Sequence, residues 1–305
     1  MNTKEFVVNV IAYQLAHGSS LDLCAKSLSV AGVPALGIVH GGGRGCVLRV
    51  DGPVAGVWIP LRGRLQLGDV GDTFLSYPGE LRVTEAEPRV RAVGRGSALW
   101  VAALGTAAAW RQVLGGSHAS VADTVLLPAR HPADRDLRRS VVALARSVAD
   151  DTPERTVDAV IDRVAALQER FSAAIARCPG RTYAQRRQVF VRLQRVRNYL
   201  AANCHLDVDN DALASMANYS PWHFIRAFRA AYEETPHAYL VRQRLEHARR
   251  LLRASPLAIA EIALASGFEN RCAFSRLFRQ RFGTTAGAMR RGARMMTPAL
   301  PIRLG

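Results

Sequence analysis

The sequence predicts an α+β protein in which a β-rich first half precedes an all-helical second half. Eighteen of the 24 glycines lie before residue 120, and that many glycines suit hairpins and bulges but would destabilise helices. Short apolar runs separated by turn residues recur there at a spacing of about 8–12 residues, which is typical of a small sandwich or barrel. After residue 106 the apolar residues repeat at helical spacing instead.

Residues 4–29 keep a rough helical period and are predicted to begin with a helix. The candidate strands then follow at residues 36–39, 46–50, 54–59, 64–67, 73–77, 81–84, 89–93 and 99–103. The strand-and-turn rhythm of residues 57–74 resembles that of cupin-type barrels. We therefore expect residues 1–131 to form a small β-barrel, cupin-like domain with some helix, and to act as an effector or sensor domain.

The first half shows no pattern of catalytic or metal-binding residues. Enzymatic cupins hold a metal with a His-x-His pair, a Glu and a further His, whereas the histidines here are scattered, at His17, His40, His118 and His131. We expect no metal, no cofactor and no enzyme activity, and instead a dry core or an apolar ligand cavity.

A glycine-rich loop and an arginine-rich hairpin can each be interpreted as purely structural or as a ligand-binding site. Residues 41–45 lack the Lys-Ser/Thr pair of a phosphate-binding loop, so a hairpin turn is preferred. Four arginines crowd one hairpin, at Arg82, Arg89, Arg91 and Arg95. A solvated hairpin is the default there, and an anionic effector held by Arg91 and Arg95 is the alternative.

Helices are predicted over the next stretch. Residues 107–114 form a short helix that Gly115 and Gly116 end. Apolar residues at 137, 141, 144 and 148 lie on one helix face, and a near-heptad stripe runs from 157 to 175 after a start signal at 151–154. Residues 132–180 are therefore either a homodimer interface or a layer packed on the barrel, because one apolar seam fits both.

Basic charge is concentrated at the end of the chain. Residues 181–305 carry 21 arginines against 8 acidic residues, which is +13 of the net charge of +16. A polyanion-binding surface requires such an excess, and it coincides with the helical motifs described below.

The five cysteines are widely spaced and form no CxxC pair, so buried free thiols in a reducing compartment are expected. No apolar run near the N-terminus is long enough for a signal peptide or a membrane helix. We expect a cytoplasmic protein with no membrane partner.

Two helix-turn-helix units joined by one long helix are predicted over residues 190–305. Asp209 caps one helix, and Ser220 caps the next, with Pro221 in its first turn. Each unit repeats an Arg followed by Phe and Arg, at Arg226, Phe228 and Arg229 and again at Arg276, Phe278 and Arg279. Phe224, Phe228, Phe274 and Phe278 are expected in the core. The connecting helix begins at Thr235 and Pro236, and its roughly 20 residues span about 30 Å, close to one turn of duplex DNA.

Residues 190–291 resemble the DNA-binding domain of the AraC/XylS family of transcriptional regulators. The resemblance is carried by Arg244-Leu245, Glu261-Ile262-Ala263, Gly267-Phe268, residues 274–279 and Phe282-Gly283. It implies two helix-turn-helix units, double-stranded promoter DNA and RNA polymerase as partners, a homodimer, and a possible small-molecule effector whose site is unknown. Whether the output is activation or repression is left open.

The resemblance and the outward faces together give the candidate DNA contacts. Base contacts are predicted for Trp222, His223, Arg226, Asn270, Arg271, Ser275 and Arg276, and phosphate contacts for Ser220, Arg229 and Arg279. Cys272 matches a family base-reading position but is a poor hydrogen-bond donor. Partial burial against helix ends is the alternative for Trp222 and His223.

The sequence departs from the family pattern at a few positions. Asn218 and Glu233-Glu234 stand where the family usually has glycine, and Asn210 replaces an apolar residue. Ala286 and Met289 replace a usual Pro and Tyr. These changes cluster in the first unit and at the C-terminal end, so the base contacts of the second unit are the firmer prediction.

Overall fold

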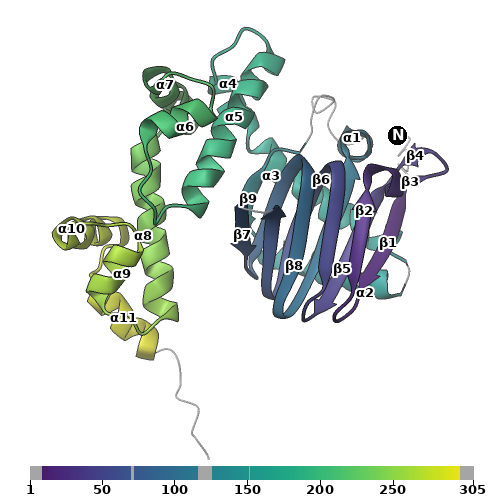
Figure 1. Ribbon diagram of the computed structural model, residues 1–305, viewed down its shortest axis with the longest axis horizontal. Helices are drawn as coiled ribbons and strands as arrows, with labels where there is room; N and C mark the ends of the chain where they lie inside the picture. The colour runs from purple at the N-terminus through teal and green to yellow at the C-terminus, as the bar shows by residue number, and fades with distance from the viewer. Residues whose placement is uncertain (1–8, 70–71, 116–125, 151, 296–305) are drawn as a thin grey trace, which may run out of the picture. The chain divides into compact units, whose positions relative to one another are not determined.

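The computed structural model describes residues 9–69, 72–115, 126–150 and 152–295. The chain divides into two compact units, which are described separately. The first comprises Met1–Ala176 and Gly180–Gln194, and the second Arg177–Pro179 and Arg195–Gly305. Figure 1 shows strands and helices in the first unit and helices alone in the described part of the second.

The predicted strands all fall within strands of the first unit, which also contains strands that were not predicted. Each of the eight candidate strands overlaps β5, β6, β7 or β8. The strands are β1 (Val10–Leu15), β2 (Ser20–Cys24), β3 (Ser29–Val30), β4 (Val33–Pro34), β5 (Leu36–Gly43), β6 (Val47–Asp69), β7 (Asp72–Ser76), β8 (Glu80–Thr106) and β9 (Ala129–Pro132), with a single 3-10 turn at Ala25–Ser27.

Strands β6 and β8 are long, and each pairs twice with the other. Val57 of β6 pairs with both Ala103 and Val83 of β8, while Arg91 of β8 pairs with Arg49 and Gly68 of β6. The strands thus form two layers that share one interior. In the described residues the path β1-β5-β8-β6-β2 stays open at β1 and β2, so the predicted closed, cupin-like barrel is not confirmed.

Alternating side chains of the sheet enter two different cores, as the period of two requires. Ile38, Val57 and Val101 pack under the helices. Val39, Trp58 and Trp100, their neighbours along each strand, fill the interior between the two layers. Both indole rings are fully buried, and their centroids lie 6.3 Å apart.

Glycine is required where Trp100 meets strand β5. A Cβ added at Gly41 would lie 2.2 Å from the Trp100 ring. Within the glycine-rich run at residues 41–45, Gly41 and Gly43 therefore serve close packing, since a Cβ at Gly43 would lie 2.9 Å from His17 Cβ.

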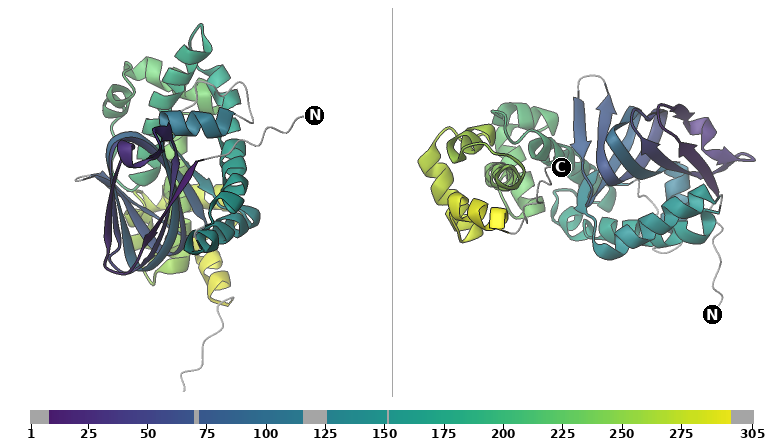
Figure 2. Two further views of the ribbon diagram at one scale, coloured as in Figure 1. Left: turned by 90° about the vertical axis from the view of Figure 1, so that its right-hand side faces the viewer. Right: turned by 90° about the horizontal axis from the view of Figure 1, so that it is seen from below.

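Helices cover one face of the sheet, as Figure 2 shows in its right-hand view. The helices of this layer are α1 (Ala107–Gly115), α2 (Arg135–Ala149) and α3 (Glu154–Glu169), and the short α4 (Ser172–Arg177) follows α3 without contributing to the core beneath them. The single helix predicted along the 157–175 stripe is interrupted between α3 and α4. The stripe residues Val157, Val160 and Val164 are buried in the same core as the sheet, which supports packing within the chain.

The predicted helix at the start of the first unit is wrong. The described part of residues 4–29 forms strands β1 and β2, because Val10 to Leu15 pair in parallel with Leu36 to Gly41. This distant pairing overrides the local helical period. Strand β9, for which no strand was predicted, pairs with β8 as an edge strand that tolerates Pro132. His118, one of the scattered histidines, lies outside the described residues.

The second unit contains the predicted helices. They are α6 (Asn210–Met216), α7 (Pro221–Tyr232), α8 (Pro236–Ala254), α9 (Ile259–Ala265), α10 (Arg271–Phe282) and α11 (Ala286–Met295), preceded by α5 (Tyr183–Ala202), whose residues are divided between the two units. The four phenylalanines predicted as core, Phe224, Phe228, Phe274 and Phe278, are fully buried.

Candidate nucleic-acid interface

The outward face of α7 carries four of the five candidate contacts of the first helix-turn-helix unit, and the fifth, Ser220, directly precedes the helix. Trp222, His223, Arg226 and Arg229 are all exposed. Trp222 is 59% exposed, so the alternative that it is buried against helix ends does not hold within this unit. Behind this face Phe224 and Phe228 lie at T-shaped geometry in the core and fix the rotation of the helix.

Side chains on this face are organised before any ligand binds. The guanidinium carbon of Arg226 lies 4.4 Å from the centroid of the Trp222 ring, within the range of a cation–π pair. The His223 ring meets the Trp222 ring edge-on at 5.0 Å. Arg226 therefore has a preferred direction, and the three side chains form one polar and aromatic group.

Ser220 does not cap α7 with its side chain, contrary to the sequence prediction. It occupies the N-cap position, but its hydroxyl makes no cap hydrogen bond. Instead Ser220 Oγ and His223 Nδ1 share a hydrogen bond of 2.8 Å.

In the second helix-turn-helix unit, α10 exposes Arg271, Ser275, Arg276 and Arg279. Asn270, the remaining candidate, precedes the helix and caps it. Asn270 Oδ1 accepts hydrogen bonds from the backbone amides of Cys272 and Ala273, at 2.8 and 3.1 Å. Its carbonyl oxygen is therefore engaged with the helix, and its Nδ2 amide is the group left to approach a base.

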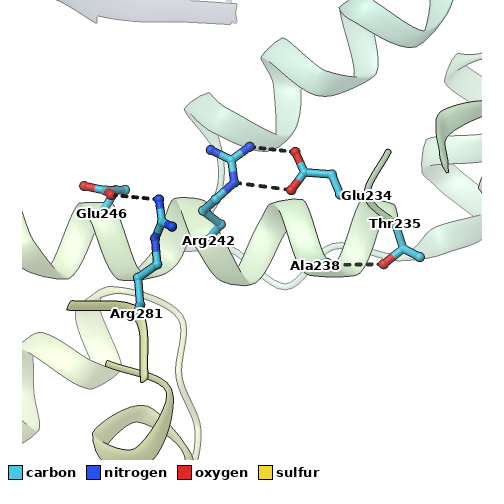
Figure 3. Close-up of polar contacts among 6 residues, drawn as sticks. All are labelled: Glu234, Thr235, Ala238, Arg242, Glu246 and Arg281. Atoms are coloured by element: carbon cyan, nitrogen blue, oxygen red, sulfur yellow. Dashed lines mark hydrogen bonds and ion pairs between the residues drawn. The ribbon is translucent and has the colours of Figure 1, made fainter. Parts of the chain in front are cut away.

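Helix α8 connects the two helix-turn-helix units. Thr235 caps α8 by accepting from the amide of Ala238 at 3.2 Å. Glu234 takes two hydrogen bonds from Arg242, of 2.7 and 3.3 Å (Figure 3). Burial by itself would lower the pKa of Arg242, but the hydrogen bond and charge of Glu234 raise it overall. Glu234, one of the two acidic residues that depart from the family pattern, thus ties the α7–α8 turn to α8.

The C-terminal half of α8 contacts the second helix-turn-helix unit. Glu246 lies 3.7 Å from Arg281 of α10 (Figure 3) and 2.8 Å from Arg249. Arg244 donates to the carbonyl oxygens of Cys204 and Leu206, at 2.7 and 2.9 Å, and so joins α8 to the chain that follows α5. These contacts stabilise a fixed separation between α7 and α10.

Arg177 contacts the end of α7, and the sequence does not predict this contact. Its guanidinium donates to the carbonyl oxygens of Ala230 and Ala231, at 3.2 and 2.9 Å, which satisfies the C-terminal end of α7. Those partners are more than fifty residues away along the chain, so no local pattern indicates the contact. With His223, Arg226 and Arg229 it lines an open groove of about 720 Å³ along α7.

The described residues show no group of three or more His, Cys, Asp or Glu side chains that could hold a metal ion. No helix among them is long and apolar enough to cross a membrane. All five cysteines are described and none forms a disulfide, with Cys272 exposed on α10.

Two exposed, arginine-bearing helices, each backed by a phenylalanine core and joined by one rigid helix, define a double helix-turn-helix protein. A family model described as a helix-turn-helix domain matches residues 213–292. The probable transcription factor PqrA of Proteus vulgaris is 33% identical over 85 residues, which cover 28% of this chain and 70% of that protein. The chain belongs to the AraC/XylS family of DNA-binding transcriptional regulators, a family of regulators and not of enzymes.

Other matches also fall on the helical unit. The transcriptional regulator GlxA of Rhizobium meliloti is 45% identical over 85 residues, which cover 28% of this chain but 26% of that protein. The DNA-binding domain of AdpA, solved with a target DNA, is 30% identical over 36% of this chain and 98% of its own, with a TM-score of 0.34. The match thus spans about a quarter of the length of GlxA and 31% of the MmsAB operon regulatory protein of Pseudomonas aeruginosa.

Proposed function

We propose that this chain binds promoter DNA by placing α7 and α10 in two successive major grooves, and that its sheet domain controls the binding. The observation that carries the proposal is the pair of exposed arginine faces fixed at the two ends of α8. At about 1.5 Å per residue, the 19 residues of α8 span roughly 28 Å, close to the ~34 Å turn of duplex DNA.

Base reading is assigned to Trp222, His223 and Arg226 of the first unit and to Asn270, Arg271, Ser275 and Arg276 of the second. Arginine can donate two hydrogen bonds to O6 and N7 of guanine, which contributes about 1–3 kcal/mol of discrimination for each good pair. Trp222 can pack on a thymine methyl group while it holds Arg226.

Phosphate contacts are assigned to Ser220, Arg229 and Arg279. Both arginines are exposed and lie three residues after a base-reading arginine, one helical turn further along the same face. Arg229 also lines the groove along α7, where Arg177 and Arg226 add to the positive charge that a phosphate backbone would meet.

The sheet domain is assigned the sensing role. It has its own two cores, one within the sandwich and one under the helices, and so can respond to a ligand as a separate body. Its relation to cupin-like sensor barrels, a small-molecule effector and contact with RNA polymerase are parts of the same proposal. A homodimer would need a surface other than the buried stripe of α3.

Footprinting on DNA selected from a random library tests this function. We expect two protected patches on one face of the duplex, about 10 base pairs apart, and a change in affinity when the right effector is added. Uniform, salt-sensitive coating without discrete patches would contradict the proposal. Discrete patches that no small molecule alters would instead indicate an architectural binder that senses nothing.

A further inference from the structure

Ser220 and His223 form a hydrogen-bonded pair at the start of α7. Ser220 Oγ and His223 Nδ1 lie 2.8 Å apart, and either atom can be the donor, depending on the tautomer of the imidazole. Both residues are exposed, so DNA can reach them. An imidazole that is bonded through one nitrogen keeps its other nitrogen, here Nε2, for a further partner.

The imidazole of His223 is held in place by its neighbours. Its ring is perpendicular to that of Trp222, with the two centroids 5.0 Å apart. The other charged or titratable side chains that line the groove beside it are Arg177, Arg226, Arg229 and Tyr219. No acidic residue is among the described residues that line this groove. Ser220 therefore meets no competition from a carboxylate of the groove for the Nδ1 atom.

The second helix-turn-helix unit has a different arrangement at the same place. Asn270 directly precedes α10, as Ser220 precedes α7, but its carbonyl oxygen accepts from the amides of Cys272 and Ala273. The third residue after Asn270 is Ala273, which has no hydrogen-bonding side chain. The Ser220 hydroxyl makes no cap hydrogen bond. Of the two residues that precede these helices, Ser220 is thus the one that can act on a base-reading side chain.

The single hydroxyl proton of Ser220 links its two contacts. A phosphate oxygen of DNA can only accept, so Ser220 must donate that proton when it binds the backbone. The bond to His223 then persists only if Nδ1 carries a proton and donates it to Ser220 Oγ. In a neutral ring this leaves Nε2 as an acceptor, whereas in a protonated ring Nε2 is a donor.

We propose that Ser220 is a positioning residue that couples the phosphate backbone to base choice, by fixing the tautomer in which His223 reads a base. With the backbone bound, neutral His223 accepts from the amino group of adenine or cytosine, and protonated His223 donates to O6 or N7 of guanine. If Ser220 instead donated to Nδ1, Nε2 would be a donor in both states and base choice would not change. The inference rests on the proposed DNA reading by α7 and names the bases that one residue prefers.

Base preference at two pH values tests the coupling. The full-length protein is bound to the selected DNA and to its single-base variants, and His223→Ala identifies the position that His223 reads. There we expect adenine or cytosine to be preferred at about pH 8 and guanine at about pH 5.5, because an imidazole ordinarily gains a proton between the two. The preference should change by about three- to tenfold, the size of one hydrogen bond. The same preferred base at both pH values, or no position altered by His223→Ala, overturns the proposal.

Variants separate positioning from a merely structural role. Ser220→Ala should abolish the pH-dependent change in base preference, and Ser220→Thr, which keeps a hydroxyl, should restore it. Urea unfolding of Ser220→Ala should hardly change, since this hydroxyl does not cap α7. Ser215→Ala is the matched control, because it removes an exposed hydroxyl from α6 and should leave the change intact. A pH-dependent change that survives in Ser220→Ala overturns the proposal.

The same titrations separate this inference from the proposed function. The position that Arg276 reads is the internal reference, because arginine stays charged at both pH values and its base preference should not change. Base-specific binding with an unvarying preference at the His223 position would leave DNA reading intact and overturn the role of Ser220. Binding without base preference at either pH would instead contradict the proposed function.

Discussion

Arg226 and Trp222 form a stacked pair on α7, with 4.4 Å between the guanidinium carbon and the ring centroid. The pair directs the arginine before DNA arrives and lowers the entropy lost on binding. We expect Trp222→Ala to weaken specific binding by about 3–10-fold, because a cation–π pair contributes about 0.5–1 kcal/mol or more. Trp222 is mostly exposed, so unfolding should hardly change. Equilibrium binding to the selected DNA checks this, and an unaltered affinity would show that the stack has no role.

Arg276 and Arg279 lie on one exposed face of α10 but are assigned different roles. Arg276→Ala should relax the base preference at one position by about 1–3 kcal/mol. Arg279→Ala should weaken all sequences alike and reduce the salt slope by about one unit. Binding to a set of single-base variants at several salt concentrations measures both. If Arg279→Ala changes base preference instead, the division into base and phosphate contacts is wrong.

Gly267 and Gly283 both have a left-handed backbone, but only Gly267 is crowded. A Cβ at Gly267 would lie 2.8 Å from Arg244 Nε and 3.0 Å from the Cys204 carbonyl oxygen, whereas Gly283 has nothing within 4 Å. Gly283→Ala should cost about 1 kcal/mol for the backbone alone. Gly267→Ala should cost about 2 kcal/mol or more, since it also displaces Arg244. Urea unfolding of both variants measures the two losses in the free energy of unfolding. Equal losses would mean that the Arg244 contacts contribute little to stability.

Glu233 ends α7 in a left-handed conformation, with φ of 60°. A residue with a side chain is strained there, and its negative charge faces the negative end of the helix dipole. We expect Glu233→Gly to stabilise the helical unit by about 1 kcal/mol. The exposed contact with Arg177, at 3.9 Å, should detract little. Asn218→Gly, at φ of 57°, is the control with a smaller gain, because asparagine tolerates this region. A loss of stability on Glu233→Gly would contradict the claim that the left-handed backbone at Glu233 is strained.

Cys272 provides a probe of the interface, since its thiol is exposed on α10 beside Arg271. Specific DNA should slow its reaction with a maleimide, because the groove would cover it. Cys24 is partly exposed in the sheet unit and is the internal control, whereas Cys46, Cys178 and Cys204 are buried. Mass spectrometry of labelled peptides measures each rate. Equal labelling of Cys272 with and without DNA would place α10 away from the groove.

Local apolar spacing predicts those elements whose conformation does not depend on a distant partner. The four core phenylalanines were placed by helical spacing, and the strands within residues 36–103 by short runs between turns. Strand β1 was missed because its partner, Leu36 onward, lies 26 residues beyond Val10 and decides its conformation. Local spacing cannot show which distant backbone will complete a sheet.

The sequence predicts that the candidate DNA contacts lie on exposed helix faces, but it does not predict the hydrogen bonds around them. Neither the Ser220–His223 bond nor the two carbonyl contacts of Arg177 follow from residue type. The Arg177 contacts arise because the last carbonyl groups of α7 have no amide partner within the helix, whereas the Ser220–His223 bond joins two side chains. Arg82 is similar: the sequence favoured a solvated hairpin, whereas strand alternation and the second layer place its side chain over Phe74.

The central claim is that α7 and α10 read separate grooves. Guanine methylation interference tests it most directly, on the native chain, Arg226→Ala and Arg276→Ala. We expect two sets of interfering guanines about one helical turn apart, with Arg226→Ala losing one set and Arg276→Ala losing the other. Loss of the same set in both variants, or one uninterrupted set in the native chain, would contradict the account.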